Sequence, residues 1–238
     1  MKKYLTISLC AVLAIMALHR TDGGNPYTVS PQESERILNL IFSRSIDIYK
    51  KYRGVESRRK EVVQEFDPET NALRTTSEII TVRKDYYYEK PDVTVIAYRK
   101  DGTDMKPSHA RIMKSIPTYP VFDEKGREHY DIRVADTKTI NGKKCYRIQV
   151  MPREETSRYF SGNMYFAVNT LEAVFIEGTL AKLSFPMKYF KIELNTGSVD
   201  GVPVVSSGAV HVRIRVPIFY PDTMIVSTIS VLESKLIQ

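Results

Sequence analysis

The fold is decided by the stretch Asn141-Gly142-Lys143-Lys144-Cys145-Tyr146-Arg147-Ile148-Gln149-Val150-Met151-Pro152. Asn and Gly both tolerate positive φ, so this pair between apolar runs predicts a tight hairpin turn. After the turn, Tyr146, Ile148 and Val150 alternate with Arg147 and Gln149 until the proline ends the pattern. A period of two is typical of a strand with one apolar and one polar face. The stretch therefore predicts an antiparallel sheet that buries one face.

The same alternation extends from this hairpin in both directions along the chain. Near the C-terminus, Val210, Val212 and Ile214 alternate with His211 and Arg213. In all we predict about ten strands joined by short turns, which favours an antiparallel meander. They are expected near residues 60–66, 73–89, 93–99, 130–134, 146–150, 164–168, 174–180, 185–194, 210–216 and 224–232. A single twisted sheet of this length must curl, close or be covered.

Two segments are available to cover the sheet. The first begins at Ser30-Pro31-Gln32-Glu33, which combines a helix cap, a proline at the first helical position and a glutamate able to complete a capping box. A helix is expected from there to about Tyr52, stopping at Gly54. The second is the aperiodic segment 101–129, which we interpret as a lid-like insertion. The predicted fold is mainly β with α: one curved antiparallel sheet, an unclosed half-barrel, with the helix and the lid-like segment over its concave face.

The first residues have the pattern of a secretion signal. Lys2 and Lys3 precede the apolar run Leu5 to Leu18, and its roughly 14 apolar residues are too few for a membrane span of about 20. We predict a signal and linker over 1–23, a domain over 24–238 and a periplasmic location. The alternative is an uncleaved N-terminal segment that anchors the chain in the inner membrane. Leu9 disfavours lipidation of Cys10, and cleavage would leave Cys145 with no partner for an intramolecular disulfide.

Patterns that would indicate catalysis or metal binding are missing from the sequence. It has no Gly-x-Ser-x-Gly nucleophile elbow. His19, His109, His129 and His211 are dispersed without metal-ligand spacing. Cys145 borders an alternating strand, which favours a small buried hydrophobic residue over a nucleophile. The net charge of +7 is a mild excess for 238 residues and gives no argument for nucleic acid. We predict a protein that is not an enzyme and has no cofactor, metal or nucleic-acid partner, although a catalytic site assembled from distant residues stays open.

The order of elements resembles the LolA/LolB-like family of periplasmic lipoprotein carriers and outer-membrane lipoprotein-sorting proteins. The resemblance covers about residues 28–234. It rests on the helix before the first strand, the break at Lys90-Pro91, the stretch 141–152 and the hairpin pattern over 164–178. It implies an unclosed barrel with helices on its concave side and a role in holding acyl chains.

The resemblance and the alternation together suggest a hydrophobic ligand, a lipid or lipoprotein acyl chain, between the curved sheet and its helical cover. Burying acyl chains is favourable in itself, so no catalytic group is required. The residues expected to line the cavity are Ile37, Ile41, Ile80, Val82, Tyr86, Tyr88, Tyr146, Ile148, Val150, Phe166, Val210, Val212 and Ile214. The alternative is a non-catalytic interaction or scaffold protein with a filled core and envelope protein partners. In either case we expect a monomer.

Overall fold

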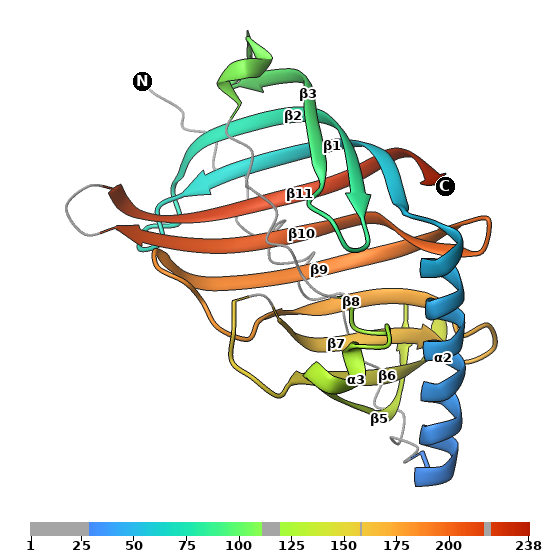
Figure 1. Cartoon of the computed structure of the whole chain (residues 1–238). Coiled ribbons are helices and arrows are strands. Elements are labelled where there is room, and N and C mark those ends of the chain that lie inside the picture. Colours follow the sequence, from blue (N-terminus) through green and yellow to red (C-terminus); the bar gives the residue numbers. More distant parts are fainter. Residues whose placement is uncertain (1–28, 111–119, 158, 217–219) are drawn as a thin grey trace.

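The computed structural model describes residues 29–110, 120–157, 159–216 and 220–238. They form one antiparallel sheet of 11 strands, with a long helix, α2 (Pro31–Lys51), standing against one end of it (Figure 1). The strands are β1 (Gly54–Phe66), β2 (Leu73–Tyr86), β3 (Asp92–Lys100), β4 (Thr103–Met105), β5 (Tyr130–Ile140), β6 (Lys143–Pro152), β7 (Phe160–Ala167), β8 (Ala173–Leu180), β9 (Met187–Val199), β10 (Val202–Val216) and β11 (Tyr220–Ile237).

The sheet is a meander with one long-range seam. Its order is β4-β3-β2-β1-β11-β10-β9-β8-β7-β6-β5, so the last strand lies between β1 and β10. The strands β4 and β5 end the sheet on its two sides and do not pair with each other. The predicted mainly β fold with an unclosed antiparallel sheet is confirmed. The additional strand is β4, a three-residue partner of β3 within the segment expected to be irregular.

The tight turns follow the sequence signal that predicted them. Asn141 and Gly142 both have positive φ, 50° and 75°, which is the geometry of a two-residue hairpin turn. Asp101-Gly102 and Asp200-Gly201 adopt the same pair of conformations between β3 and β4 and between β9 and β10. Each turn joins neighbouring strands, as the meander requires.

The helix α2 begins at its predicted cap. The Ser30 hydroxyl accepts a hydrogen bond from the backbone N–H of Glu33 at 3.2 Å, and Pro31 occupies the first turn. The capping box is only half formed, because the Glu33 carboxylate bonds Arg36 at 2.7 Å instead of returning to the cap. Ile37, Ile41 and Phe42 are the buried face of the helix. Among the described residues, no helix is long and apolar enough to span a membrane.

A packed core lies between α2 and the strands β5 to β8. It comprises Ile37, Ile41, Phe42, Phe122, Tyr130, Val134, Ile148, Val150, Tyr159, Phe160 and Phe166. The Phe122 ring stands edge-on to the rings of Phe42 and Phe166, with centroids 5.3 and 5.4 Å apart. Part of the segment 101–129 therefore covers the sheet together with α2, through Phe122 and the short helix α3 (Gly126–His129). Residues 111–119, also part of the expected lid, lie outside the described residues.

Candidate functional site on the inner face of the sheet

Strand register identifies the residues that share a face with α2. Directly opposed residues of antiparallel strands point to the same side of a sheet. Starting from the core residue Val150, opposed positions form one row: Val150, Gly162, Gly178, Ile192, Val210, Ser227 and Val63. We call the side of the sheet that carries this row the inner face.

The inner face continues beyond the core as an apolar strip on the other strands. The apolar strip comprises Val63, Ile79, Phe190, Val210, Val212 and Ile225, from β1, β2, β9, β10 and β11. Val212 and Ile79 are nearly fully buried, and Val63, Phe190 and Ile225 are partly exposed. None of the six belongs to the core beneath α2. The inner face thus has a filled half under the helix and a second apolar area outside that core.

Many of the residues predicted to line a cavity lie on or against the inner face, but in two different places. Ile37, Ile41, Ile148, Val150 and Phe166 are buried in the core, with Tyr146 packed against it. In contrast, Val210, Val212 and Ile214 lie in or beside the apolar strip on β10. The structure therefore separates the predicted set into core residues and strip residues.

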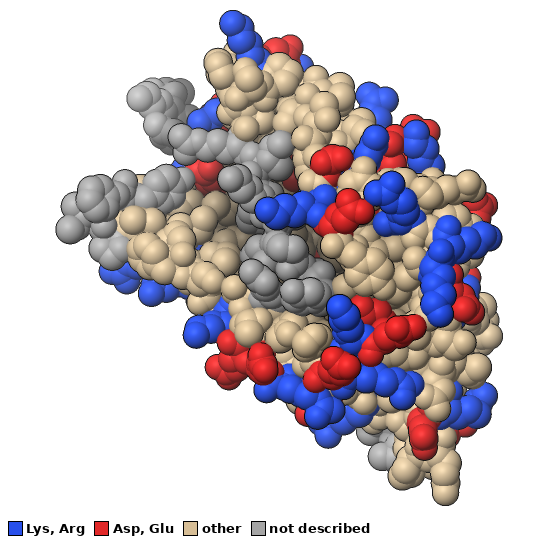
Figure 2. All heavy atoms as spheres, viewed as in Figure 1, with Lys and Arg blue, Asp and Glu red and all other residues tan. Residues whose placement is uncertain are grey.

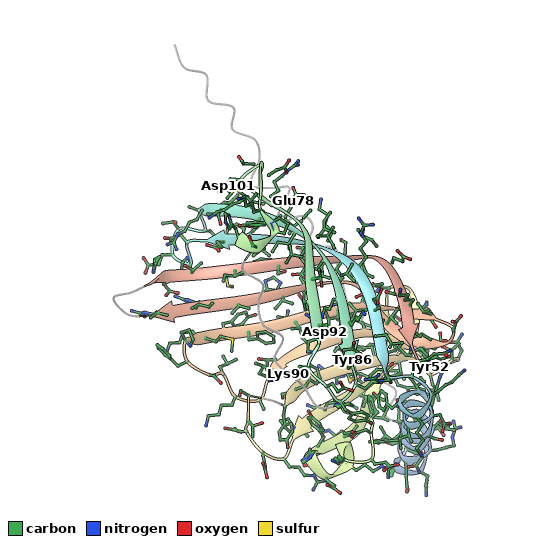
Figure 3. The ribbon with its side chains drawn as sticks, turned by 45° about the horizontal axis from the view of Figure 1, so that its top comes forward. Tyr52, Glu78, Tyr86, Lys90, Asp92 and Asp101 are labelled. Atoms are coloured by element: carbon green, nitrogen blue, oxygen red, sulfur yellow. The ribbon has the colours of Figure 1, made fainter. Side chains whose placement is uncertain are left out.

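Three of the predicted residues lie on the opposite face, and a fourth lies beyond the end of β2. Ile80 and Val82 alternate with the buried inner residues Ile79 and Thr81, so they lie on the outer face with their partners Lys60 and Arg58. Tyr86 has the same parity; its hydroxyl donates to Asp92 at 3.3 Å (Figure 3). Tyr88 follows the strand and is 65% exposed. The expectation that Ile80, Val82 and Tyr86 share the cavity face is wrong, because Ile79 and Thr81 take the buried positions of β2. The Tyr88 ring instead lies 6.2 Å from the ring of Tyr49 on α2.

Sequence reasoning missed a group of polar residues on the inner face of β1 and β2. This polar cluster consists of Ser57, Arg59, Glu61, Thr81, Arg83 and Asp85. The Asp85 carboxylate joins the two arginines: Oδ2 accepts from Arg59 Nη2 and Oδ1 from Arg83 Nε, each at 2.6 Å. Arg59 Nε also donates to the Ser57 hydroxyl at 2.7 Å.

The polar cluster is largely withdrawn from solvent. The side chains of Arg59 and Arg83 are only 13% and 17% exposed. Burial lowers the pKa of Arg59, and burial raises the pKa of Glu61 despite the nearby arginines. One feature of the sequence could have indicated the polar cluster. The run 56–61 carries charged residues on both faces of β1, which is an interior strand of the sheet. The alternation of apolar and polar residues could not reveal the polar cluster, because neither the odd-numbered nor the even-numbered positions of this run are apolar.

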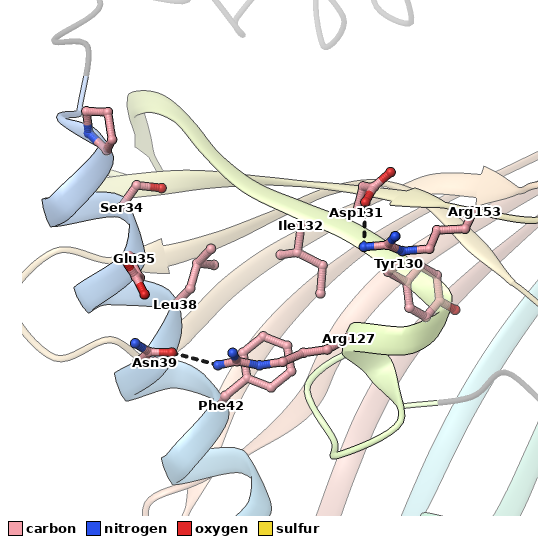
Figure 4. Close-up of a pocket in the computed structure, with 11 residues that line it drawn as sticks. Ser34, Glu35, Leu38, Asn39, Phe42, Arg127, Tyr130, Asp131, Ile132 and Arg153 are labelled. Carbon is pink, nitrogen blue, oxygen red and sulfur yellow. Dashed lines mark hydrogen bonds and ion pairs between the residues drawn. The ribbon is translucent and has the colours of Figure 1, made fainter.

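A separate groove of about 470 Å³ lies between the N-terminal half of α2 and the edge strand β5 (Figure 4). Four of its polar side chains are paired with one another. Arg127 donates to Asn39 at 2.6 Å and stacks over the Phe42 ring at 4.4 Å, and Arg153 pairs with Asp131 at 2.8 Å. The groove thus combines one ion pair and one Arg–Asn hydrogen bond with the apolar side chains of Leu38, Phe42 and Ile132. Within the described ranges, no group of His, Cys, Asp and Glu side chains is arranged to hold a metal ion.

Charges on the exterior are mixed. Figure 2 shows basic and acidic side chains interspersed over the visible face of the molecule. Arg44 pairs with Glu172 at 3.4 Å, and Lys50 lies 3.8 Å from Glu124. These exposed pairs contribute little to stability, which sets them apart from the buried polar cluster.

Comparison with known proteins gives a likeness of fold. No family model and no curated protein matches the chain. Three similar solved structures share low identity with it. A LolA superfamily protein from Nitrosomonas europaea has 9% identity and a TM-score of 0.43, covering 86% of this chain and 94% of its own. A protein domain from Vibrio parahaemolyticus, named for outer-membrane lipoprotein sorting, has 8% identity, a TM-score of 0.43 and coverages of 85% and 92%. A DUF1329 family protein from Desulfovibrio piger has 13% identity, a TM-score of 0.40 and coverages of 85% and 92%.

Proposed function

We propose that the chain is a non-enzymatic, exported envelope protein that holds the apolar chain of a lipid or lipoprotein on the inner face of its sheet. The observation that carries this proposal is the apolar strip, which extends the inner face beyond the core. The core beneath α2 is filled by its own side chains, so the ligand would occupy the strip. Each buried methylene would contribute about 0.8 kcal/mol, which supports binding without a catalytic group.

A second candidate function is that of an envelope scaffold with a filled interior. The dense packing around Phe122 and Phe160 favours it for the half of the sheet under α2. In such a protein the strip would be structural, and partners would contact the outer surface or the edge strands.

Protein purified from the native envelope distinguishes the two functions. Mass spectrometry of an organic extract should find co-purifying lipid, and the intact mass should lack the residues before a cleavage site between Ala17 and Gly24. An extract without lipid, together with no uptake of a fluorescent fatty acid, would leave the scaffold as the better description. A mass that retains Lys2 and Lys3 would contradict the cleaved leader.

Matched variants locate the binding face. Ile225→Phe adds volume to the apolar strip, and Ile80→Phe makes the same change on the outer face of β2. We expect Ile225→Phe to lower probe affinity about tenfold with a small change in melting temperature, because it displaces ligand rather than neighbours. In a filled core, overpacking would instead cost about 1–3 kcal/mol. Ile80→Phe should leave binding unchanged, and an equal effect of both variants would argue against a site on the inner face.

A further inference from the structure

We infer that the polar cluster on β1 and β2 binds the acidic head group, a carboxylate or a phosphate, of the amphiphile whose chain lies on the apolar strip. The inference rests on the proposed function and specifies the chemistry of the ligand. Its evidence is the position of the cluster, its spare hydrogen-bond donors and one buried hydroxyl.

The polar cluster and the apolar strip are continuous along two strands. On the inner face of β1 the order is Ser57, Arg59, Glu61 and then Val63, and on β2 the residue after Arg83 and Thr81 on this face is Ile79. At about 3.3 Å per residue, roughly 13 Å separates Arg59 from Val63. One face thus changes from charged to apolar over the length of a short acyl segment. An amphiphile has the same order of polar and apolar parts.

Among the described residues, several donors of the two arginines face no acceptor. Asp85 engages only Nη2 of Arg59 and Nε of Arg83, so both terminal nitrogens of Arg83 and Nη1 of Arg59 have no partner among the described residues. A guanidinium presents its N–H groups as a fork that matches the paired oxygens of a carboxylate or phosphate. Glu61 makes no hydrogen bond to either arginine within the described part of the chain, and burial favours its neutral form. The two guanidinium groups thus share the carboxylate of Asp85 as their hydrogen-bonded partner, and each keeps further N–H groups.

A buried hydroxyl beside the arginines also lacks a partner. Thr81 is 1% exposed, lies directly opposite Arg59 in the register, and its Oγ1 has no hydrogen bond among the described residues. Leaving a buried hydroxyl unsatisfied costs free energy that a purely structural ion-pair network would not require. An anionic oxygen held by the arginines would accept its hydrogen bond, so the three residues together describe one acceptor site.

The test compares a fluorescent fatty acid with its methyl ester in the full-length protein. The two probes share a chain and differ in the acidic group, so we expect the acid to bind about tenfold more tightly. Arg83→Gln should remove most of this difference and leave the affinity for the ester unchanged. Arg58→Gln, which removes the same charge from the outer face of β1, should change neither. Competition by decanoate and by decyl phosphate then identifies which acidic group is preferred.

Thr81→Val is a second test of the head-group site that remains usable if Arg83→Gln does not fold. Valine has nearly the shape of threonine and removes only the unpartnered hydroxyl, so the variant should melt no lower than the parent and lose affinity for the acid alone. Equal binding of acid and ester by the parent, or equal loss of both probes in Arg83→Gln and Thr81→Val, would overturn the head-group assignment while leaving the apolar site in place. Failure of both probes to bind the parent would overturn the proposed function as well.

Discussion

Glu61 is a partly buried carboxyl group on a central strand. Its pKa is raised above the ordinary value of 4.5, first by burial and against the attraction of Arg59 and Arg83. When the folded-state pKa lies above the unfolded one, the folded protein binds the proton more tightly. The contribution of Glu61 to the free energy of unfolding is then fully present below about pH 4.5. It is lost as the pH rises through the folded-state pKa. Glu61 therefore opposes folding near neutral pH.

Glu61→Gln should remove this pH dependence. We expect the variant to gain melting temperature relative to the parent at pH 8 and to show little gain at pH 4, where the parent carboxyl is protonated. Glu78→Gln is the control on the outer face: Lys60 lowers the pKa of Glu78, so its contribution has the opposite sign. Thermal melts of the three proteins at both pH values measure this, and a Glu61→Gln variant that is less stable at pH 8 would contradict the assignment.

For individual residues, the sequence predicted the face of the sheet only in strands where every second position is apolar and the positions between them are polar. Val210 and Val212 could be assigned because His211 and Arg213 fixed the other side as polar, and the structure places them on the inner face. In β2, apolar residues occur at both odd and even positions, namely Ile79, Ile80 and Val82. The choice depended on burial of Thr81, which only its neighbours in space determine.

Among the strands, β7 and β8 meet through a pair of glycines that an aromatic ring covers. A Cβ atom at Gly178 would lie 2.4 Å from Phe160 Cε2 and from the backbone oxygen of Ser161. Gly178→Ala should therefore destabilise the protein by about 1–3 kcal/mol, because neither the ring nor the backbone can move away freely. Gly197→Ala in β9 is the matched control, since its Cβ would meet only Ser206 Cβ at 3.6 Å. Urea denaturation would measure both, and equal midpoints would contradict the packing of Phe160 on Gly178.

The predictability of each element depended on how local its signal is. The helix α2 and the strands after Asn141-Gly142 were predicted because caps, turns and periodicity lie within a few residues of one another. The strand β4 was missed because three residues are too few to show alternation. The covering role of Phe122 had no sequence signal, since it arises from contacts with Phe42 and Phe166 far along the chain.

For the whole molecule, Cys145 offers a probe of unfolding. It is fully buried, and burial raises the pKa of its thiol, so the native protein should react slowly with a thiol reagent. In a Cys10→Ser background it is the remaining cysteine of the chain. We expect its labelling rate to rise steeply with urea and to follow the unfolding transition. Rapid labelling without denaturant would show that the sheet opens locally around β6.

The arrangement of the complete sheet was predicted only in part. Short turns indicated which consecutive strands are neighbours, and the meanders β1 to β4 and β5 to β11 follow that rule. The pairing of β1 with β11 joins residues that no turn connects. The sequence therefore indicated an unclosed sheet but not which strands would form its two edges.

The seam between β1 and β11 affects how the protein is made. The interior strand β11 follows the other ten strands along the chain, so a ribosome synthesises it after them. Until β11 emerges, β1 and β10 each present an unpaired edge, and the two meanders have no strand to join them. Pairing over such a sequence separation is slow to form. A nascent chain would thus lack the complete native sheet until β11 is synthesised, although each of the two meanders can pair its own strands earlier.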